Sequence, residues 1–333
     1  MENILHHEYA KVVITGSNGN KFKIKVNMEN DDIFVPVDTW ETSYPIELIE
    51  KILRVKGPAY LCDEIMRDER PGYVENALRF DVLAYVNSEQ MRNTRVLDFG
   101  CGSGASTMVL SRMLPFTQII GVELEEDLLE IAKLRSVHHK MQDRTKFLVS
   151  PDGENLPEDV GSFDYVFLNA VYEHLLPNER RTVLQLLWKH LKPGGLMFIN
   201  QTPYRWFPIE SHTTSGLIFI NYMPDRLASF YAQHFSKRKL VDNNWQTLLR
   251  KGIRGGSTKE ICRLLSKDSY EPVVINPSQL GLKDRIDIWY AASSKSRYLF
   301  VKKTFFYIAK LIKMTTGVIF LPTLALAIQK SIK

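Results

Sequence analysis

Residues 100–104 of this 333-residue chain read Gly-Cys-Gly-Ser-Gly and follow directly after a short apolar run. That run, residues 95–99, has the composition of a buried strand, and residues 105–114 have that of a helix. A glycine turn between strand and helix lets a ligand approach the backbone and the unpaired N–H groups of the helix. Residues 119–122 form a second apolar run that ends at Glu123. A carboxylate there can accept both hydroxyls of a ribose, so the stretch predicts a nucleoside site.

The glycine spacing separates two classes of nucleoside site. A dinucleotide fingerprint reads G-x-G-x-x-G, whereas this turn reads G-x-G-x-G and is preceded by Asp98. The form Asp-x-Gly-x-Gly-x-Gly, with an acid at the end of the next strand, resembles the class I S-adenosylmethionine (SAM) methyltransferases. Four further segments between residues 72 and 200 follow in the order of that family. The resemblance implies an α/β fold with a Rossmann-like, doubly wound, mostly parallel sheet, and SAM as the cofactor.

The same resemblance assigns the residues that bind the cofactor. The segment 152–157, Asp-Gly-Glu-Asn-Leu-Pro, is similar to the acidic turn that follows the family's third strand. The adenine amino group is a donor that needs an acceptor, and Asp152 would supply it; a plain Asp-Gly turn is the alternative. The implied cofactor-binding residues are Asp98, Gly100, Cys101, Gly102, Gly104, Glu123, Asp152, Gly153 and Asn169.

Residues 169–175 follow the fourth predicted strand, at the edge where the family holds the methyl group. Methyl transfer to a hydroxyl needs in-line placement and a base, and His174 is a candidate because a histidine can accept a proton at neutral pH. Glu173 and His174 match part of the Glu-x-x-Glu-His sequence of ubiquinone-pathway O-methyltransferases, in which two acids and the histidine can hold a divalent metal. Ala170 replaces the first acid here, so we expect no metal. Orientation of a loop is the alternative role for His174.

Residues 201–214 are rich in aromatic and hydrogen-bonding side chains and follow the fifth predicted strand. A Lys-Pro-Gly-Gly turn, which the family shares, precedes that strand. Inserts at this point commonly form a lid over the acceptor in class I folds, although a packed connector is the alternative. His212, two residues after Glu210, is the second candidate base. The other predicted substrate-binding residues are Arg205, Trp206, Glu210 and Thr213.

The remaining chain predicts three regions. We expect an N-terminal β appendage over residues 1–44, a methyltransferase domain over 45–294 with a lid insertion at about 201–270, and a basic amphipathic tail over 295–333. Residues 273–275 and 285–291 are predicted to supply the closing antiparallel strands of the sheet. Three scattered cysteines do not suit a disulfide framework, and no signal peptide is evident. We therefore expect a cytoplasmic location.

The tail carries the positive charge of the chain. Eight Lys or Arg and no acid lie from residue 295 onward, which leaves a net charge of −3 on the preceding residues and argues against a nucleic-acid surface. If residues 299–314 are helical, four lysines share one face and apolar side chains occupy the rest. The uncharged segment 314–328 contains Pro322 and is too short to span a bilayer. This pattern predicts an interfacial anchor on an anionic membrane surface; a helix packed on the body or a dimer contact is the alternative.

Together these features predict a SAM-dependent methyltransferase that acts on a small-molecule, sugar or lipid-linked acceptor, on oxygen, with nitrogen and carbon left open. A predicted SAM site does not by itself prove catalytic turnover, so a SAM-binding regulatory or assembly subunit is a second hypothesis. A third, an NAD-dependent reductase, is disfavoured by the glycine spacing and the Lys-Pro-Gly-Gly turn.

Overall fold

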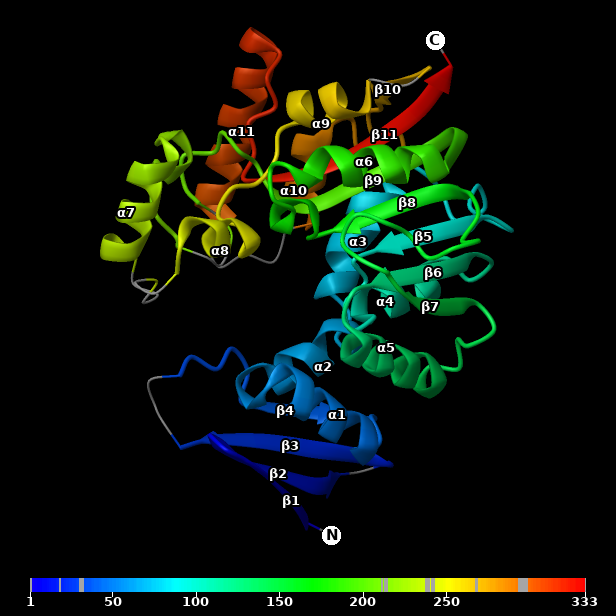
Figure 1. Cartoon of the computed structure of the whole chain (residues 1–333), viewed down its shortest axis with the longest axis vertical. Helices are drawn as coiled ribbons and strands as arrows, with labels where there is room; N and C mark the ends of the chain where they lie inside the picture. Colours follow the sequence, from blue (N-terminus) through cyan, green and yellow to red (C-terminus); the bar gives the residue numbers. More distant parts are fainter. Residues whose placement is uncertain are drawn as a thin grey trace.

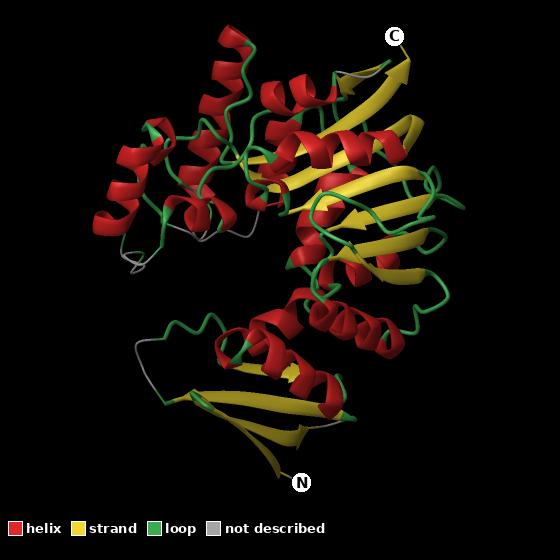
Figure 2. Ribbon diagram, in the orientation of Figure 1, coloured by secondary structure: helices red, strands yellow, loops and turns green. Residues whose placement is uncertain are grey.

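The computed structural model describes residues 2–17, 19–29, 33–210, 212, 215–236, 240, 243–266, 269–292 and 299–332. Within these residues the chain forms a seven-stranded sheet and a separate four-stranded sheet (Figures 1 and 2). The larger sheet has the strand order β10-β11-β9-β8-β5-β6-β7. Strands β5 to β9 run parallel, β11 is antiparallel to β9, and β10 is antiparallel to β11. The predicted Rossmann-like, mostly parallel sheet is therefore confirmed.

The strands of the larger sheet are β5 (Arg95–Phe99), β6 (Gln118–Glu123), β7 (Thr145–Val149), β8 (Phe163–Asn169), β9 (Leu191–Pro203), β10 (Tyr270–Val274) and β11 (Thr323–Ile332). The helices from residue 74 onward are α3 (Val74–Leu83), α4 (Ala105–Met113), α5 (Glu126–His138), α6 (Glu179–His190), α7 (Asp225–Phe235), α8 (Trp245–Arg250), α9 (Thr258–Leu265), α10 (Arg285–Ala292) and α11 (Leu299–Thr316), with short 3₁₀ turns η2 (Tyr172–His174) and η3 (Ile220–Tyr222).

Alternating side chains of the parallel strands build a core on each face of this sheet. On β5, Leu97 belongs to the core that contains α6 and α9, whereas Val96 belongs to the core that contains α3 and α4. The same alternation recurs on β9, where Ile199 faces the first core and Phe198 the second. Strands that are apolar on both faces suit a sheet covered by helices on both sides. The helices thereby fix the carboxyl ends of the strands at one edge, where side chains from different strands meet.

Two predictions about the far end of the sheet are wrong. Residues 285–291, predicted as a strand, form helix α10. The cause is a helix cap: the Asp284 carboxylate accepts hydrogen bonds from the N–H groups of Ile286 (3.0 Å) and Asp287 (3.1 Å). The second closing strand is instead β11, which lies within the segment predicted as a tail and pairs with both β9 and β10. The prediction of a strand near residues 273–275 agrees with β10.

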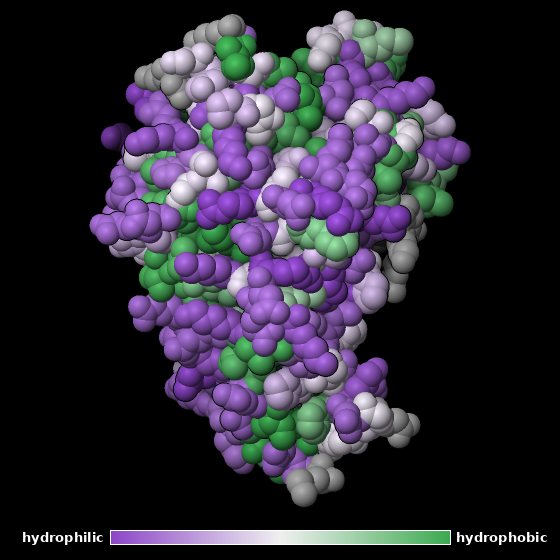
Figure 3. Space-filling model, turned by 90° about the vertical axis from the view of Figure 1, so that its right-hand side faces the viewer, coloured by the Kyte–Doolittle hydropathy of each residue, from purple (hydrophilic) through white to green (hydrophobic). Residues whose placement is uncertain are grey.

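The N-terminal antiparallel sheet is present, as predicted. It consists of β1 (Glu2–His7), β2 (Ala10–Ser17), β3 (Lys21–Met28) and β4 (Thr39–Thr42), followed by α1 (Ile46–Lys56), the 3₁₀ turn η1 (Pro58–Tyr60) and α2 (Leu61–Glu69). One face of the sheet packs under α1 through buried residues such as Val12, Ile24 and Ile52. Figure 3 shows the face at the right of Figure 1: it is mostly hydrophilic, with separate apolar patches, and narrows toward this N-terminal unit.

Helix α11, from the predicted tail, packs on α10 in an unexpected orientation. Three of its four lysines face the body: Lys310 and Lys313 lie 2.9 and 2.6 Å from the Asp284 carboxylate, and the Lys302 side chain is buried, whereas Lys303 is exposed. Apolar residues of α11 face solvent instead, among them Phe300 and Met314. Among the described residues, no helix is long and apolar enough to cross a membrane.

Candidate active site

The glycine turn joins the end of β5 to the start of α4. Gly100, Gly102 and Gly104 have φ angles of +69°, +54° and +78°, a region that favours glycine. A Cβ on Gly100 would lie 2.8 Å from the Val171 side chain, and one on Gly104 would lie 2.7 Å from Ala132. A Cβ on Gly102 would have no described atom within 4 Å. The outer two glycines therefore permit close packing, whereas Gly102 faces open space that a ligand can enter.

Glu123 lies at the carboxyl end of β6, beside this turn. Its carboxylate accepts hydrogen bonds from the N–H groups of Gly102 (2.9 Å) and Leu124 (2.7 Å), which fix its position. Leu124 is about half exposed, and a Cβ on Gly153 would lie 3.9 Å from its side chain. A fixed carboxylate next to an exposed apolar surface fits the ribose and the flat base of SAM. Sequence reasoning missed Leu124, although an exposed leucine directly after the ribose acid is a usable signal.

Asp98 is buried under the turn and joins three strands. It accepts hydrogen bonds from the Thr107 hydroxyl (2.6 Å) and the Asn169 amide (3.5 Å), and Asn169 accepts one from Asn200 on β9 (3.2 Å). Burial raises the pKa of Asp98 to about 6, although these two donors lower it in part. Asp98 and Asn169 thus position the strand ends. Cys101, also predicted at the cofactor, turns its side chain into a core cluster with Met108 and Phe147.

Asp152 lies in an exposed turn after β7. Its carboxylate accepts hydrogen bonds from the Asn155 amide (3.1 and 2.9 Å) and from the Glu154 N–H (2.7 Å). The Asn155 amide, followed by the Glu154 N–H, lowers the pKa of Asp152. The side chain is therefore an ionised acceptor whose oxygens are already used within its own turn. The adenine role of Asp152 and Gly153 stays a prediction.

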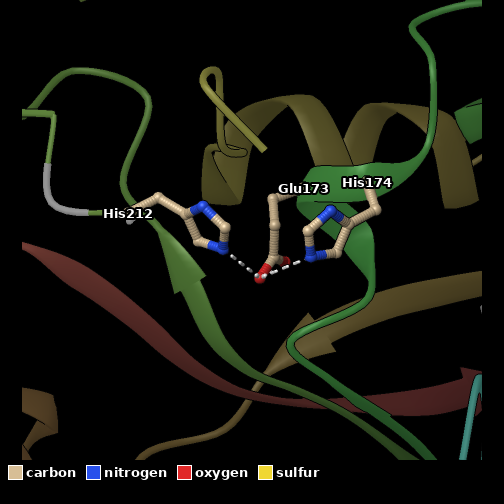
Figure 4. Close-up of side chains that lie close together, drawn as sticks. All are labelled: Glu173, His174 and His212. Carbon is tan, nitrogen blue, oxygen red and sulfur yellow. Dashed lines mark ion pairs between the residues drawn. The ribbon is translucent and has the colours of Figure 1, made fainter. Parts of the chain in front are cut away.

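The two candidate bases lie together. His174 is in the 3₁₀ turn after β8, and His212 comes from the lid, yet both imidazoles point toward the carboxylate of Glu173 (Figure 4). The Glu173 oxygen Oε1 lies 4.0 Å from Nε2 of His174 and 3.9 Å from Nε2 of His212. The two rings are edge to face, with centroids 5.2 Å apart. Burial raises the pKa of Glu173, and His174 offsets part of this effect.

The residues predicted to bind the methyl acceptor stabilise the segment predicted as a lid. The Glu210 carboxylate accepts hydrogen bonds from the N–H groups of Ser215 (2.7 Å) and Gly216 (2.9 Å), so it fixes the loop that carries His212. Arg205 donates to the carbonyl of Asn221, and its guanidinium lies 4.8 Å from the ring centre of Trp206. Burial lowers the pKa of Arg205 to about 10. Trp206 is about half exposed.

Thr213, the remaining predicted substrate-binding residue, lies outside the described residues. Of the lid residues predicted from sequence, the structure therefore brings only His212 against Glu173 and His174.

Part of the chain matches a known protein family. A family described as "Methyltransferase domain" matches residues 96–195, which extend from β5 into the first residues of β9. Residues 96–195 therefore form a methyltransferase domain, similar to those of class I SAM-dependent enzymes. This methyltransferase domain carries the glycine turn, Glu123 and the Glu173–His174 pair, whereas His212 lies beyond the matched residues.

Several curated proteins are similar to this chain. The mitochondrial ubiquinone biosynthesis O-methyltransferase of Saccharomyces cerevisiae is 25% identical over 188 residues, which cover 55% of this chain and 51% of the relative. The carboxy-S-adenosyl-L-methionine synthase of Actinobacillus succinogenes is 26% identical over 212 residues, which cover 62% of this chain and 79% of that synthase. The chain thus spans about half the length of its ubiquinone-pathway relative.

Among solved structures, an O-methyltransferase family protein from Burkholderia thailandensis is similar with a TM-score of 0.44 and 14% identity. The likeness covers 68% of this chain and 58% of that protein.

Proposed function

We propose that this chain transfers the methyl group of SAM to a hydroxyl oxygen of a small-molecule acceptor. One observation carries the proposal: the Glu173–His174–His212 cluster adjoins the cofactor turn. Val171, two residues before Glu173, packs against Gly100, and β5 and β8 are neighbours in the sheet. The side chains that could bind or deprotonate an acceptor hydroxyl are therefore close to the expected cofactor site.

The chain's own residues have three tasks in such a reaction. Glu123 accepts the ribose hydroxyls, and Asp98 with Asn169 holds the strand ends. When bound, SAM supplies an electrophilic methyl group on its sulfur. The lid and the cluster orient the acceptor in line with that group, exclude water and receive the hydroxyl proton. The new bond would join the acceptor oxygen to the methyl carbon as the bond between that carbon and sulfur breaks, and the sulfur of the demethylated cofactor would keep the electron pair.

Methyl transfer can be tested with a mixture of candidate acceptors. The full chain is incubated with methyl-labelled SAM and a small-molecule extract, and labelled compounds are identified by mass spectrometry. The proposal predicts a labelled methyl ether together with demethylated cofactor. SAM binding without any labelled product would favour a non-catalytic SAM-binding subunit, and a product labelled only on nitrogen or carbon would contradict the choice of oxygen.

We further propose that the acceptor is lipid-linked and that the chain works at an anionic membrane surface, from the cytoplasmic side. The support comes from α11, whose exposed apolar residues recur along one face, including Phe300, Tyr307, Leu311 and Met314. Phe300 is 82% and Met314 78% exposed. A helix that presents large apolar side chains and the exposed Lys303 to solvent suits the boundary between water and lipid.

A further inference from the structure

Three atoms with lone pairs face one another in the Glu173–His174–His212 cluster (Figure 4). One ligand atom from each side chain lies within 4.8 Å of the other two. The two distances to Glu173 Oε1, 3.9 and 4.0 Å, are too long for hydrogen bonds. They are about twice the roughly 2.0–2.2 Å bond between zinc and a His or Glu ligand. A small cation between the three atoms could therefore contact all of them after minor side-chain movement.

Glu173 gives the strongest indication that a positive charge belongs at this point. Its side chain is 0% exposed. One oxygen, Oε2, accepts a hydrogen bond from the Thr202 hydroxyl (2.9 Å), but Oε1 has no hydrogen-bond donor among the described residues. A buried carboxylate oxygen without a partner is costly unless a cation compensates it. This unpartnered oxygen is the one aimed at the two imidazoles.

The surroundings of the three side chains also fit a metal site. Nδ1 of His174 lies 2.7 Å from the carbonyl oxygen of Arg250, so the ring proton belongs on Nδ1 and the Nε2 lone pair points into the cluster. Metal-binding histidines are oriented in this way, by a second contact that fixes the tautomer. Gly252, with φ +83°, forms one wall, and a Cβ there would lie 3.0 to 3.1 Å from His212 and Glu173.

We propose that Glu173, His174 and His212 together bind one divalent transition-metal cation. Two imidazoles and one carboxylate suit Zn²⁺, Fe²⁺ or Mn²⁺ better than Mg²⁺ or Ca²⁺. The expectation of no metal rested on Ala170, which lacks the first acid of the Glu-x-x-Glu-His pattern. In the folded chain the lid supplies His212 as the third ligand. With a cation bound, the two imidazoles would act as ligands and not as the base, and the cation would instead polarise the acceptor hydroxyl as a Lewis acid so that its proton leaves to solvent. That task rests on the proposed function; the binding of the cation does not.

The direct test is titration of the EDTA-treated full chain with Zn²⁺, Mn²⁺ or Co²⁺, without SAM or acceptor. We expect one ion per chain by calorimetry, a visible absorption band with Co²⁺, and far weaker binding of Mg²⁺. Glu173→Gln, His174→Gln and His212→Gln should each lower the Zn²⁺ affinity by at least about tenfold. The matched control is His234→Gln on α7, whose Nδ1 contacts the carbonyl oxygen of Phe230; it should bind Zn²⁺ as the wild type does.

SAM titration of each variant checks the fold, because Glu123 and the glycine turn lie outside the cluster. If Glu173→Gln does not fold, His212→Gln on the lid still tests the proposal. Lack of stoichiometric metal binding by the wild type overturns it, as does equal affinity in the folded ligand variants. The cluster would then be an ion pair between Glu173 and a protonated histidine. Metal binding without labelled methyl product would instead contradict only the proposed function.

Discussion

At the scale of single residues, Glu123 is the sharpest test of the cofactor site. Glu123→Ala removes the acceptor of the ribose hydroxyls, and each hydrogen bond to a charged group contributes roughly 1.5–3 kcal/mol. We expect SAM affinity to fall at least about tenfold in a calorimetric titration. Glu126→Ala, at an exposed acid in the first turn of α5, is the matched control and should bind normally. Unchanged affinity in a folded Glu123→Ala protein would contradict the assignment.

We expect Asp98 to make the stability of the SAM-free protein depend on pH. Its folded-state pKa of about 6 exceeds the ordinary value of about 3.9. Between these values the folded state binds more protons than the unfolded state, so the free energy of unfolding falls as pH rises from about 4 to about 6. Asp98→Asn should remove the part of this decrease that Asp98 causes. By pH 7 the free energy of unfolding of the variant should exceed that of the wild type by on the order of 1–3 kcal/mol. Denaturant unfolding at pH 5, 6 and 7 measures the difference; parallel curves for the two proteins would sink the argument.

The site divides into a part that local sequence predicts and a part that it does not. The glycine turn and Glu123 are adjacent to their strands, so order along the chain is enough to place them. His212 meets Glu173 only because the lid folds back over the end of β8. Glu210 looked like a partner for His212 through its spacing, but its carboxylate is used by the N–H groups of its own loop. Contacts between distant segments are fixed by packing, which a single sequence does not display.

At the scale of elements, a buried charged network joins α5 to α2. Arg135 on α5 is fully buried and donates to the Glu64 side chain (3.0 Å), and it lies 3.6 Å from the Asp68 carboxylate. Tyr44 donates to the same carboxylate (2.6 Å). Burial by itself would raise the pKa of Asp68, but Arg135 and the donors from His139 and Tyr44 hold it below its usual value. The network therefore ties the helices of the N-terminal unit to the main sheet.

Arg135→Met should destabilise the protein by about 3–5 kcal/mol, because it leaves the Asp68 charge buried without its cation. Urea unfolding at pH 7 measures the change, and Lys133→Met at an exposed position of the same helix should cost less than about 0.5 kcal/mol. The Asp68 contribution is present above the ordinary carboxyl pKa of about 3.9 and is lost as pH falls below it. Equal stability of the two variants at pH 7 would show that the network contributes little.

Sequence patterns predicted the parallel strands correctly. They failed for segments whose residue pattern is compatible with two different structures. The apolar run that became β5 is short and bounded by glycine, which leaves a strand as the simplest interpretation. Residues 285–288 alternate polar and apolar side chains, and apolar and aromatic residues follow them, which suggested a strand. Asp284 and Asp287 nevertheless form a helix cap, and this cap was the missed signal. Strand β11 is apolar and follows a basic helix, so it resembled a membrane anchor; only its pairing with β9 distinguishes it.

For the molecule as a whole, the exposed apolar face of α11 provides the test of the proposed membrane binding. Deletion of residues 297–333 is not a usable test, because it removes β11 from between β9 and β10. The triple variant Phe300→Gln, Leu311→Gln, Met314→Gln removes only exposed apolar side chains of α11. We expect wild-type protein to float with vesicles that contain phosphatidylglycerol and the triple variant to stay in solution. Each of the three apolar side chains would contribute roughly 1.5–3 kcal/mol to membrane binding when it is buried in lipid.

Salt separates the two forces that could bind α11 to lipid. Lys310 and Lys313 already contact Asp284, so they are not available to anionic headgroups, and flotation should weaken only slightly when salt is raised. The triple variant should unfold at the wild-type urea concentration because its changed side chains are exposed. Val137→Gln, at an exposed apolar position on α5, is the control and should float like the wild type. Wild-type protein that stays in solution, or a triple variant that floats equally well, would leave the α11 face to a protein partner and remove the case for a lipid-linked acceptor.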